Sequence, residues 1–388
     1  MKILHCCLAA FYIDNFGYQE NILPKIHKLL GHTVEILAST ETYFKGNNIG
    51  YLNPSQYFSK DGIRVTRIPY ISFLPKSLVR KLRIYMGITE KLVEFKPDII
   101  FLHDIQFLSI LKIVRYKKQN PHVVIFADSH TDFVNSARGF ISKNILHRII
   151  YKYCAKSIEP YTSRFYGTLP ARVEFLKLMY NISSEKVELL ELGADDTIFD
   201  FSQYDAIRES TRERLNISHD DFVVICGGKL DKRKNIHLLV DAFESIKDTS
   251  IKLILFGTPN FEMTYLLQKL NSLSNVRYLG WQSTAEIYNL LFAADLGVFP
   301  GTHSVLWEQA CGVGLPCVFK KWDMIQHVDL GGNCLFIQED DSSEIQNVIT
   351  RISSDKILYH KMKEIAIRKC IPQFSYLQIA KRAINTND

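Results

Sequence analysis

Several features that define other protein classes are missing from this sequence of 388 residues. Its eight cysteines form no C-x-x-C pair, and several lie inside apolar runs, which is typical of buried thiols. No apolar run approaches the roughly 18 residues that a membrane-spanning helix needs. The first apolar stretch contains His5 and is followed by no small-x-small cleavage site, which favours a buried strand over a signal peptide. We therefore expect a protein of the reducing cytoplasm.

An extreme composition is also absent. Apolar residues make up 47% and charged residues 23%, which excludes a disordered chain or a fibre. The net charge of +6 is uneven, because residues 1–195 hold 26 Lys and Arg against 17 Asp and Glu. A basic first half favours an anionic partner, such as a membrane surface or a phosphorylated substrate; the alternative is a solvated basic surface. No nucleic-acid-binding motif accompanies the charge, so we expect no nucleic-acid partner.

What the sequence does contain is a regular alternation of short apolar runs and helical patterns. The strands expected in the first half are Lys2–Leu8, Val34–Ala38, Arg64–Ile68, Asp98–Leu102, Val123–Ala127 and Phe165–Gly167. Those expected in the second half are Phe222–Gly227, Ile251–Phe256, Val276–Leu279, Leu296–Phe299, Pro316–Phe319 and Cys334–Ile337. Such alternation predicts α/β architecture, with two doubly wound, Rossmann-like domains.

Polar segments mark the expected boundaries. Gly193–Asn216 combines a turn with a polar stretch, so we place an N-terminal domain at 1–195 and a second domain at 196–370. The segment Glu41–Asp61, rich in Asn, Gly, Tyr and Ser, predicts a long surface loop. Arg64 and Arg67 flank a strand and are expected at the surface.

The first chemically informative run follows the strand that ends at Gly227. It reads Gly227-Gly228-Lys229-Leu230-Asp231-Lys232-Arg233-Lys234 and precedes a helix. Glycines at a strand end let the backbone approach a ligand, and four cations within six residues can bind phosphates. The run matches neither the Walker loop nor the dinucleotide fingerprint, and the alternative is a solvated basic turn.

A second run follows the strand that ends at Phe299. Gly301-Thr302-His303-Ser304 forms a turn that opens a helix containing Glu308. The free amides of a helix start favour an anion, and a carboxylate one turn further in can accept two ribose hydroxyls. The alternative is an ordinary capping turn with a surface glutamate.

Together these runs resemble retaining nucleotide-sugar glycosyltransferases of the GT-B fold, family 4. The resemblance rests on Gly-Gly-Lys-Leu, a lysine five residues after the first, and a Glu-x-Ala-x-Gly-x-Gly-x-Pro segment about 75 residues further on. Asn15–Glu20, Leu190–Asp195, Tyr278–Trp281 and Ala294–Leu296 also match the family pattern. The resemblance implies two domains facing across a cleft, with a C-terminal helix in 371–388 that returns to the first domain.

The resemblance also implies roles for individual residues. Lys229 and Lys234 would hold the donor diphosphate and act in catalysis, together with His130, which resembles the active-site histidine near the transferred sugar. The remaining donor-binding positions would be Gly17, Gly228, Gly280, Trp281, His303, Ser304, Val305 and Glu308. No metal site and no cofactor are expected, because fixed cations and a helix start would take the place of a metal.

One position departs from the family pattern. The family has a glutamate eight residues before the second one, and here that position is Pro300. His303 and Thr302 are the candidates to replace the missing glutamate. The predicted function is transfer of a sugar from a nucleoside-diphosphate sugar to a hydroxyl of a glycan or lipid-linked acceptor in cell-surface polysaccharide assembly. The alternatives are a degenerate glycan- or partner-binding member, or a GT-B nucleotide-sugar epimerase.

Two basic amphipathic segments suggest contact with an anionic membrane. Lys76–Leu92 and Ser136–Ser157 each carry four or five Lys and Arg side chains among aliphatic and aromatic ones. They predict peripheral attachment at the inner face of the membrane. The alternative is that their apolar sides belong to the protein core.

Overall fold

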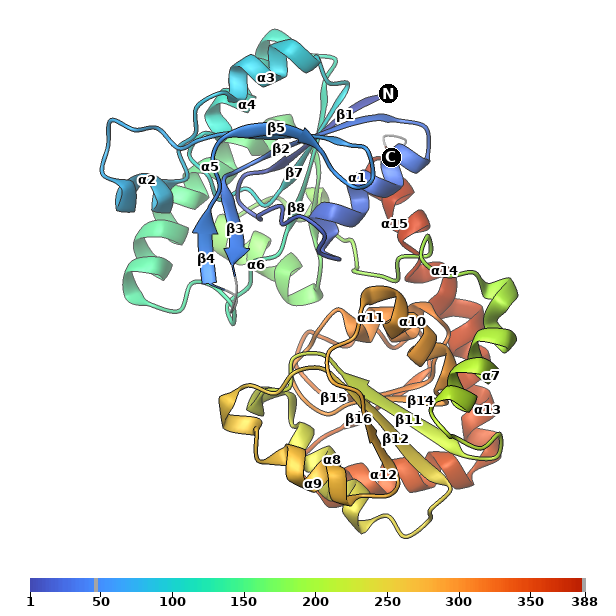
Figure 1. The fold of residues 1–388 in the computed structure, drawn as a ribbon. Coiled ribbons are helices and arrows are strands. Elements are labelled where there is room, and N and C mark those ends of the chain that lie inside the picture. Colours follow the sequence, from blue (N-terminus) through green and yellow to red (C-terminus); the bar gives the residue numbers. More distant parts are fainter. Residues whose placement is uncertain (45–47, 386–388) are drawn as a thin grey trace. The chain divides into compact units, whose positions relative to one another are not determined.

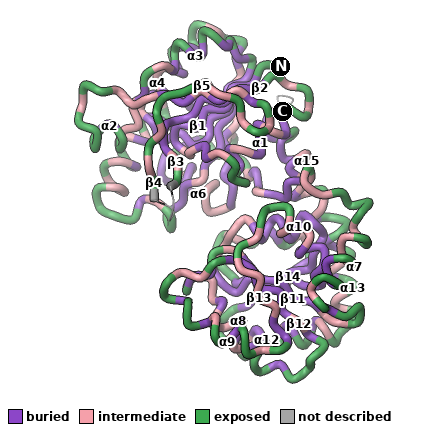
Figure 2. The backbone as a smooth tube through the Cα atoms, in the orientation of Figure 1, coloured by how far each residue is buried: buried purple, intermediate pink, exposed green. Residues whose placement is uncertain are grey.

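A computed structural model describes residues 1–44 and 48–385 of the chain. It divides into two compact units (Figure 1): the first comprises Met1–Glu191 and Ile379–Asp388, and the second comprises Leu192–Gln378. Each unit has its own sheet, and buried residues concentrate along the strands of both sheets (Figure 2). The prediction of two doubly wound α/β domains is therefore confirmed.

The first unit is built on an eight-stranded sheet with the order β10-β9-β8-β7-β1-β2-β6-β5. Its strands are β1 (Lys2–Cys7), β2 (Thr33–Ala38), β5 (Ser55–Phe58), β6 (Arg64–Arg67), β7 (Ile99–His103), β8 (Val124–Ser129), β9 (Thr162–Gly167) and β10 (Val187–Leu189). All neighbours are parallel except β5 and β6. Ile3 of β1 lies opposite Val34 and Ile99, so apolar strands stack at the centre.

Helices link the parallel strands of this sheet. They are α1 (Gln19–Leu29), α2 (Lys76–Leu82), α3 (Ile88–Phe95), α4 (Ile110–Gln119), the π-helix η1 (Ser142–Tyr151), α5 (Lys152–Ile158), η2 (Glu159–Tyr161), α6 (Pro170–Tyr180) and η3 (Ser184–Lys186). The C-terminal helix α15 (Tyr376–Ala383) ends in the first unit, where Ile379, Ala380 and Ala383 are fully buried. Arg382 of this helix bonds to Glu191 over 2.9 Å.

The second unit carries a six-stranded parallel sheet with the order β13-β12-β11-β14-β15-β16. Its strands are β11 (Phe222–Gly227), β12 (Ile251–Phe256), β13 (Val276–Tyr278), β14 (Leu296–Phe299), β15 (Cys317–Lys320) and β16 (Cys334–Ile337). Its helices are η4 (Phe201–Gln203), α7 (Tyr204–Arg214), η5 (Lys232–Lys234), α8 (Ile236–Ser245), η6 (Phe261–Met263), α9 (Leu266–Ser272), α10 (Thr284–Ala293), α11 (Leu306–Gly312), α12 (Ser342–Ser354), α13 (Lys356–Ile365), η7 (Ala366–Cys370) and α14 (Ile371–Gln373). This is the strand order of dinucleotide-binding folds.

The expected surface loop at Glu41–Asp61 is wrong. Its described residues form β3 (Glu41–Phe44) and β4 (Asn48–Tyr51), which pair with each other, and β5, which pairs antiparallel with β6. Asn48 and Gly50, which indicated a loop, belong to β4, and this strand is stabilised by its pairing with β3. Residues 45–47 of this segment lie outside the part of the chain that the structure describes.

The surface placement of Arg67 is also wrong. Its side chain is buried and bonds to Asp14 over 2.8 Å and to the hydroxyl of Tyr57 over 2.9 Å. A buried guanidinium is stable only when its donors are satisfied, and these partners satisfy it. Since Asp14 and Tyr57 lie far from Arg67 in the sequence, no local pattern could indicate the burial.

All eight cysteines are buried free thiols, as the sequence predicts. Within 1–44 and 48–385, no helix combines the length and the apolar character that a bilayer span requires.

Candidate functional site

Both sheets have a topological switch point, and several of the predicted site residues follow the strands that flank it. In such sheets ligands bind outside the carboxyl ends of the strands, where the strand order reverses. In the second unit the reversal lies between β11 and β14, and Gly228–Lys234 and Pro300–Val305 directly follow these two strands. In the first unit it lies between β1 and β7, and Gly17 and His103 belong to the segments at this edge.

The turn after β11 presents its cations to solvent. Gly228 has a φ of +108°, a conformation that suits glycine, and a Cβ atom there would lie 3.1 Å from Leu306. Lys229 and Lys232 are exposed, whereas Arg233 is paired with the buried carboxylate of Asp231 over 2.6 Å. The two exposed lysines at a strand end can meet a phosphate without first breaking a buried ion pair.

Lys234 ties this turn to the segment after β14. Its ammonium donates to the carbonyl oxygens of Thr302, over 2.6 Å, and His303, over 2.8 Å. Burial lowers the pKa of Lys234 to about 8, although Asp231 opposes the shift. A Cβ atom on Gly301 would collide with the backbone of Lys234, so the two segments pack at the closest distance that backbones allow.

Pro300, the position that departs from the family pattern, lies inside this packing. Its carbonyl oxygen accepts a hydrogen bond from Asn235 over 3.0 Å. The residue therefore holds the two segments together through its backbone and brings no charged group.

Glu308 on α11 forms a buried cluster with two histidines. Its Oε1 atom accepts from Nε2 of His303 over 2.7 Å and from Nε2 of His327 over 2.9 Å, and its side chain has no exposed surface. Burial raises the pKa of Glu308, but the two imidazoles outweigh burial and lower it to about 2. Among the described residues, Oε2 of Glu308 has no hydrogen-bond partner. One carboxylate oxygen is thus bound by two imidazoles, and the other is buried without a partner among the described residues.

Ser304, Val305, Gly280, Trp281 and Gly17 are partly or largely open to solvent. Ser304 and Val305 precede α11, whose first residue is Leu306. Gly280 has a φ of +66° after the edge strand β13, and Trp281 is 75% exposed. Gly17 is exposed, and a Cβ atom there would meet no neighbour within 4 Å, so packing does not require glycine at this position.

In the first unit, His130 follows β8 and lies beside two carboxylates. Its Nε2 atom is 3.4 Å from Asp128 Oδ1 and 3.7 Å from Glu20 Oε1. Burial lowers the pKa of His130, but Glu20 and Asp128 outweigh burial and raise it to about 9. At neutral pH His130 therefore carries a positive charge, with 22% of its side chain exposed.

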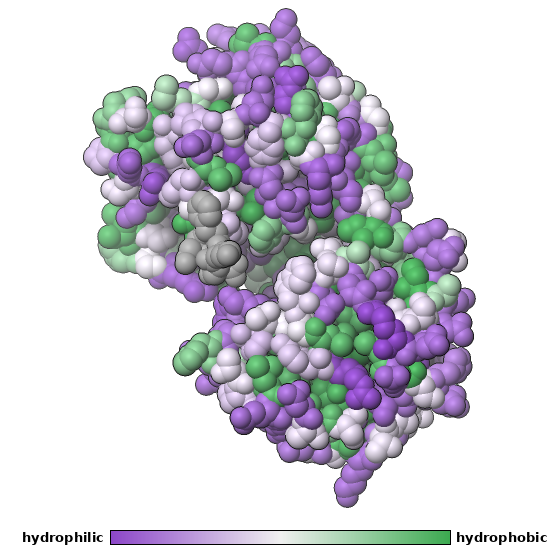
Figure 3. Space-filling model, viewed as in Figure 1, coloured by the Kyte–Doolittle hydropathy of each residue, from purple (hydrophilic) through white to green (hydrophobic). Residues whose placement is uncertain are grey.

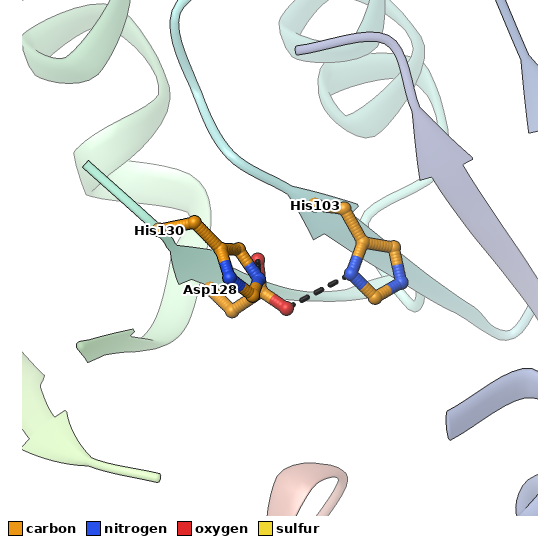
Figure 4. A group of neighbouring side chains, drawn as sticks. All are labelled: His103, Asp128 and His130. Carbon is orange, nitrogen blue, oxygen red and sulfur yellow. Dashed lines mark hydrogen bonds and ion pairs between the residues drawn. The ribbon is translucent and has the colours of Figure 1, made fainter. Parts of the chain in front are cut away.

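Asp128 is also bound on its other side (Figure 4). Its Oδ2 atom lies 2.9 Å from Nδ1 of His103, which projects from the neighbouring strand β7. Both side chains have no exposed surface. His103 is buried at the end of β7 and supports Asp128 from this side.

Two groups of described side chains have the composition of metal ligands: His103, Asp128 and His130, and His303, Glu308 and His327. In each group the imidazole nitrogens point at the carboxylate and make hydrogen bonds or ion pairs with it. We interpret them as carboxylate–imidazole clusters and assign neither as a metal centre. The expectation of no metal stays a prediction.

The two Rossmann-like units and the strand order of the second unit define an α/β fold of the GT-B type. Residues 207–369 match the family described as "Glycosyl transferases group 1". The chain is 23% identical over 315 residues to the N-acetylgalactosamine-N,N'-diacetylbacillosaminyl-diphospho-undecaprenol 4-alpha-N-acetylgalactosaminyltransferase of Campylobacter jejuni. The match covers 80% of this chain and 78% of that enzyme.

Two solved structures share the fold over almost the whole chain. The HepE protein of Anabaena, in complex with UDP, superposes with a TM-score of 0.67 at 17% identity, covering 98% of both chains. The UDP-GlcNAc 2-epimerase of Neisseria meningitidis, bound to UDP-GlcNAc, gives 0.62 at 13% identity, covering 99% of this chain and 98% of the other. The resemblance to GT-B glycosyltransferases is confirmed, and the family match supports glycosyl transfer.

The sequence did not indicate two features of the site. It gave no sign that His327 joins Glu308, because 19 residues separate them. Nor did it indicate that His103 supports Asp128, 25 residues away. The one available signal was position, since His103 and His130 each stand at the carboxyl end of an expected strand.

Proposed function

We propose that the protein is a retaining, metal-independent glycosyltransferase. It moves a sugar from a nucleoside-diphosphate sugar to a hydroxyl of a glycan or lipid-linked acceptor in cell-surface polysaccharide assembly. The observation that carries the proposal is the packing of the cationic turn after β11 against the segment that leads into α11, at the switch point of the second sheet.

The donor binds to the second unit. Lys229 and Lys234 hold the diphosphate, with the amides of Ser304 and Val305 facing the distal phosphate. The free oxygen of Glu308 accepts from a ribose hydroxyl, and Gly280 and Trp281 lie beside the base. Gly17 and His130 are the contributions of the first unit, His130 as a cation near the transferred sugar.

The chemistry needs charge stabilisation more than proton transfer. The bond between the anomeric carbon and the diphosphate breaks with its electron pair on the diphosphate, while the acceptor oxygen bonds to that carbon and gives its proton to an oxygen of the departing diphosphate. Fixed cations stabilise the negative charge that develops on the leaving group, which is the role a metal plays elsewhere.

A lipid-linked acceptor suits the surface of the first unit. The relative from Campylobacter jejuni is named for an undecaprenol-diphosphate substrate. On and beside η1, the apolar side chains of Phe140, Ile141, Ile145 and Ile149 are 43–78% exposed and alternate with the exposed cations Arg138 and Arg148.

Helix α2 extends this surface. The hydroxyl of Tyr151 at the end of η1 donates to the carbonyl oxygen of Lys81 in α2, so the two predicted membrane segments lie side by side. Hydrophobic side chains reach the surface of the first unit at the edge where α2 lies (Figure 3). Basic helices with exposed apolar residues attach to anionic leaflets, and we propose this as a peripheral contact.

The test is a transfer assay with a panel of nucleotide sugars and undecaprenyl-diphosphate-linked acceptors, in the presence of a chelator. We expect release of a nucleoside diphosphate and a product that keeps the anomeric configuration of the donor. Inverted product would overturn the retaining mechanism, and sugar isomerisation without transfer would favour the epimerase. Nucleotide binding without turnover on any pair would favour the degenerate binding protein.

A further inference from the structure

A continuous chain of buried imidazoles runs through the first unit behind Asp128. Nε2 of His103 lies 2.9 Å from Nδ1 of His5, and Nε2 of His5 lies 3.0 Å from Nδ1 of His27. Nε2 of His27 lies 2.9 Å from the carbonyl oxygen of Ala380 in α15. His5, His27 and His103 have no exposed surface.

The rings are oriented for hydrogen bonding. The planes of His5 and His103 are inclined by 21°, and those of His5 and His27 by 28°. Each N–H therefore lies near the plane of the acceptor ring, where the lone pair of the bare nitrogen is.

The end of the chain fixes its direction. A carbonyl oxygen can only accept, so Nε2 of His27 carries a proton. With that proton His27 is neutral and accepts at Nδ1, so His5 donates from Nε2. By the same reasoning His103 donates from Nε2 to Nδ1 of His5.

The hydrogen bonds of this imidazole chain need one proton more than three neutral imidazoles provide. Four hydrogen bonds connect Ala380, His27, His5, His103 and Asp128, and each needs one proton. Three neutral imidazoles supply only three. The fourth proton must lie between Nδ1 of His103 and Oδ2 of Asp128. The chain ends at a carbonyl that cannot take up a proton, so it holds this proton and does not conduct it to solvent.

We propose that His27, His5 and His103 are positioning residues that hold one proton between His103 and Asp128 and thereby set the charge that Asp128 presents to His130. Any effect of the His130 charge on sugar transfer rests on the proposed function, whereas the protonation pattern of the histidines does not. Burial and the neighbouring imidazoles lower the pKa of His5, and burial lowers that of His27 to about 4, so both are neutral.

The location of the shared proton follows from the environment of Asp128. Burial raises the pKa of Asp128, but His103 and His130 outweigh burial and lower it, which favours a carboxylate beside a His103 imidazolium. Other titratable groups acting on the chain and on His130 are Cys7, Glu20, His32, Asp104 and Arg172. The His103 imidazolium offsets part of the negative charge around His130. The pKa of His130 is therefore lower than it would be beside Glu20 and an Asp128 carboxylate without that imidazolium.

The direct test is ring-nitrogen NMR of the intact chain labelled with 15N-histidine at pH 7, which needs no substrate. We expect His103 to carry protons on both nitrogens, and His5 and His27 to carry one proton each, on Nε2. A bare nitrogen on His103, or a proton on Nδ1 of His5 or His27, overturns the proposal. A correct pattern in a protein without transferase activity would contradict the proposed function and leave the proton chain standing.

A pair of variants distinguishes the effect of the imidazole hydrogen bonds from the effect of core packing. His27→Leu removes the donor to Ala380 and the acceptor for His5, so the direction of the hydrogen bonds is no longer fixed. We then expect His103 to become neutral and the pKa of His130 to rise by about 1. His27→Gln keeps one amide donor and one amide acceptor and should leave the pKa of His130 unchanged. His147→Phe is the matched control, since His147 is a buried histidine of the same unit that bonds to Tyr180 and Ser136. Equal titration of His130 in His27→Leu and wild type would overturn the proposal.

Discussion

The two units share a sheet order around their first strand but arrange the charges at that edge differently. In the first unit, His130 is held by buried carboxylates, and Asp128 is supported by a chain of imidazoles without exposed surface. In the second unit, Lys229 and Lys232 stand exposed beside a strand end, and Arg233 pairs with Asp231. A buried network fixes the position and charge of one group, whereas exposed cations can accept a polyanion without rearrangement. On the proposed function, we expect the diphosphate to bind to the second unit and a single fixed cation to act from the first.

The largest effect is expected from the cations of the second unit. Lys229→Ala and Lys234→Ala each remove a hydrogen-bonded charge from the diphosphate, so donor affinity should fall about tenfold to a hundredfold, measured by calorimetry. Lys232→Ala is the control, because it removes the same charge from the same turn at an exposed position. Equal losses of donor affinity in all three variants would mean that the donor binds to a diffuse basic surface and not to a defined site.

Glu308→Gln should weaken both the fold and donor binding. The change leaves His303 and His327 without their carboxylate in a fully buried site, which costs about 3 kcal/mol of unfolding free energy. The pKa of Glu308 is lowered from 4.5 to about 2, so its stabilisation is present above pH 4.5 and is lost as pH falls toward 2.

Chemical denaturation between pH 7 and pH 3 measures this effect. Wild type should lose stability on acidification more steeply than Glu308→Gln. The exposed Glu262→Gln serves as control and should follow wild type. Parallel curves for wild type and Glu308→Gln would contradict the buried cluster.

Donor affinity should depend on pH through Lys234. Its pKa of about 8 means that the ammonium is charged at pH 7 and becomes neutral as pH rises through 8, so donor affinity should decline between pH 7 and 9. Lys234→Arg keeps the charge over this range and should flatten the profile. A profile that is identical in wild type and Lys234→Arg would assign the pH dependence to another group.

A smaller effect is expected at the apolar surface of η1. Ile145→Ser and Ile149→Ser should each reduce sedimentation with anionic liposomes severalfold, because each removes an exposed aliphatic group. Ile357→Ser removes an isoleucine of α13 in the second unit that is 84% exposed, more than Ile145 or Ile149, and should change nothing. Wild-type binding that is equally weak with neutral and anionic lipid would refute the membrane contact.

The smallest effect is expected from a chelator. Fixed cations and not a metal stabilise the leaving group in this account, so EDTA should leave turnover unchanged. Loss of turnover that magnesium or manganese restores would contradict metal independence.

The sequence predicted well those features that are local. The strands Phe222–Gly227, Ile251–Phe256, Leu296–Phe299 and Cys334–Ile337 are continuous apolar runs, and their bounds agree with the structure to the residue. The segments around Lys229 and Glu308 could likewise be found, because each is one strand–turn–helix unit.

Features that depend on distant residues could not be predicted. In the sequence, Arg67 is an arginine at the end of a strand, and only the folded structure shows that Asp14 and Tyr57 bind its buried side chain. The imidazole chain joins positions 5, 27, 103, 128 and 380, and no spacing rule connects them. The strands β3 and β4 were missed because their stability comes from pairing with each other rather than from an apolar run.

Hydrogen–deuterium exchange of the intact chain with UDP, GDP or ADP tests the contrast between the units most directly. The account predicts that a bound nucleoside diphosphate slows exchange in peptides covering 228–235 and 300–308 of the second unit, and leaves 128–131 of the first unit unchanged. Protection confined to the first unit, or no protection with any of the three nucleotides, would contradict it.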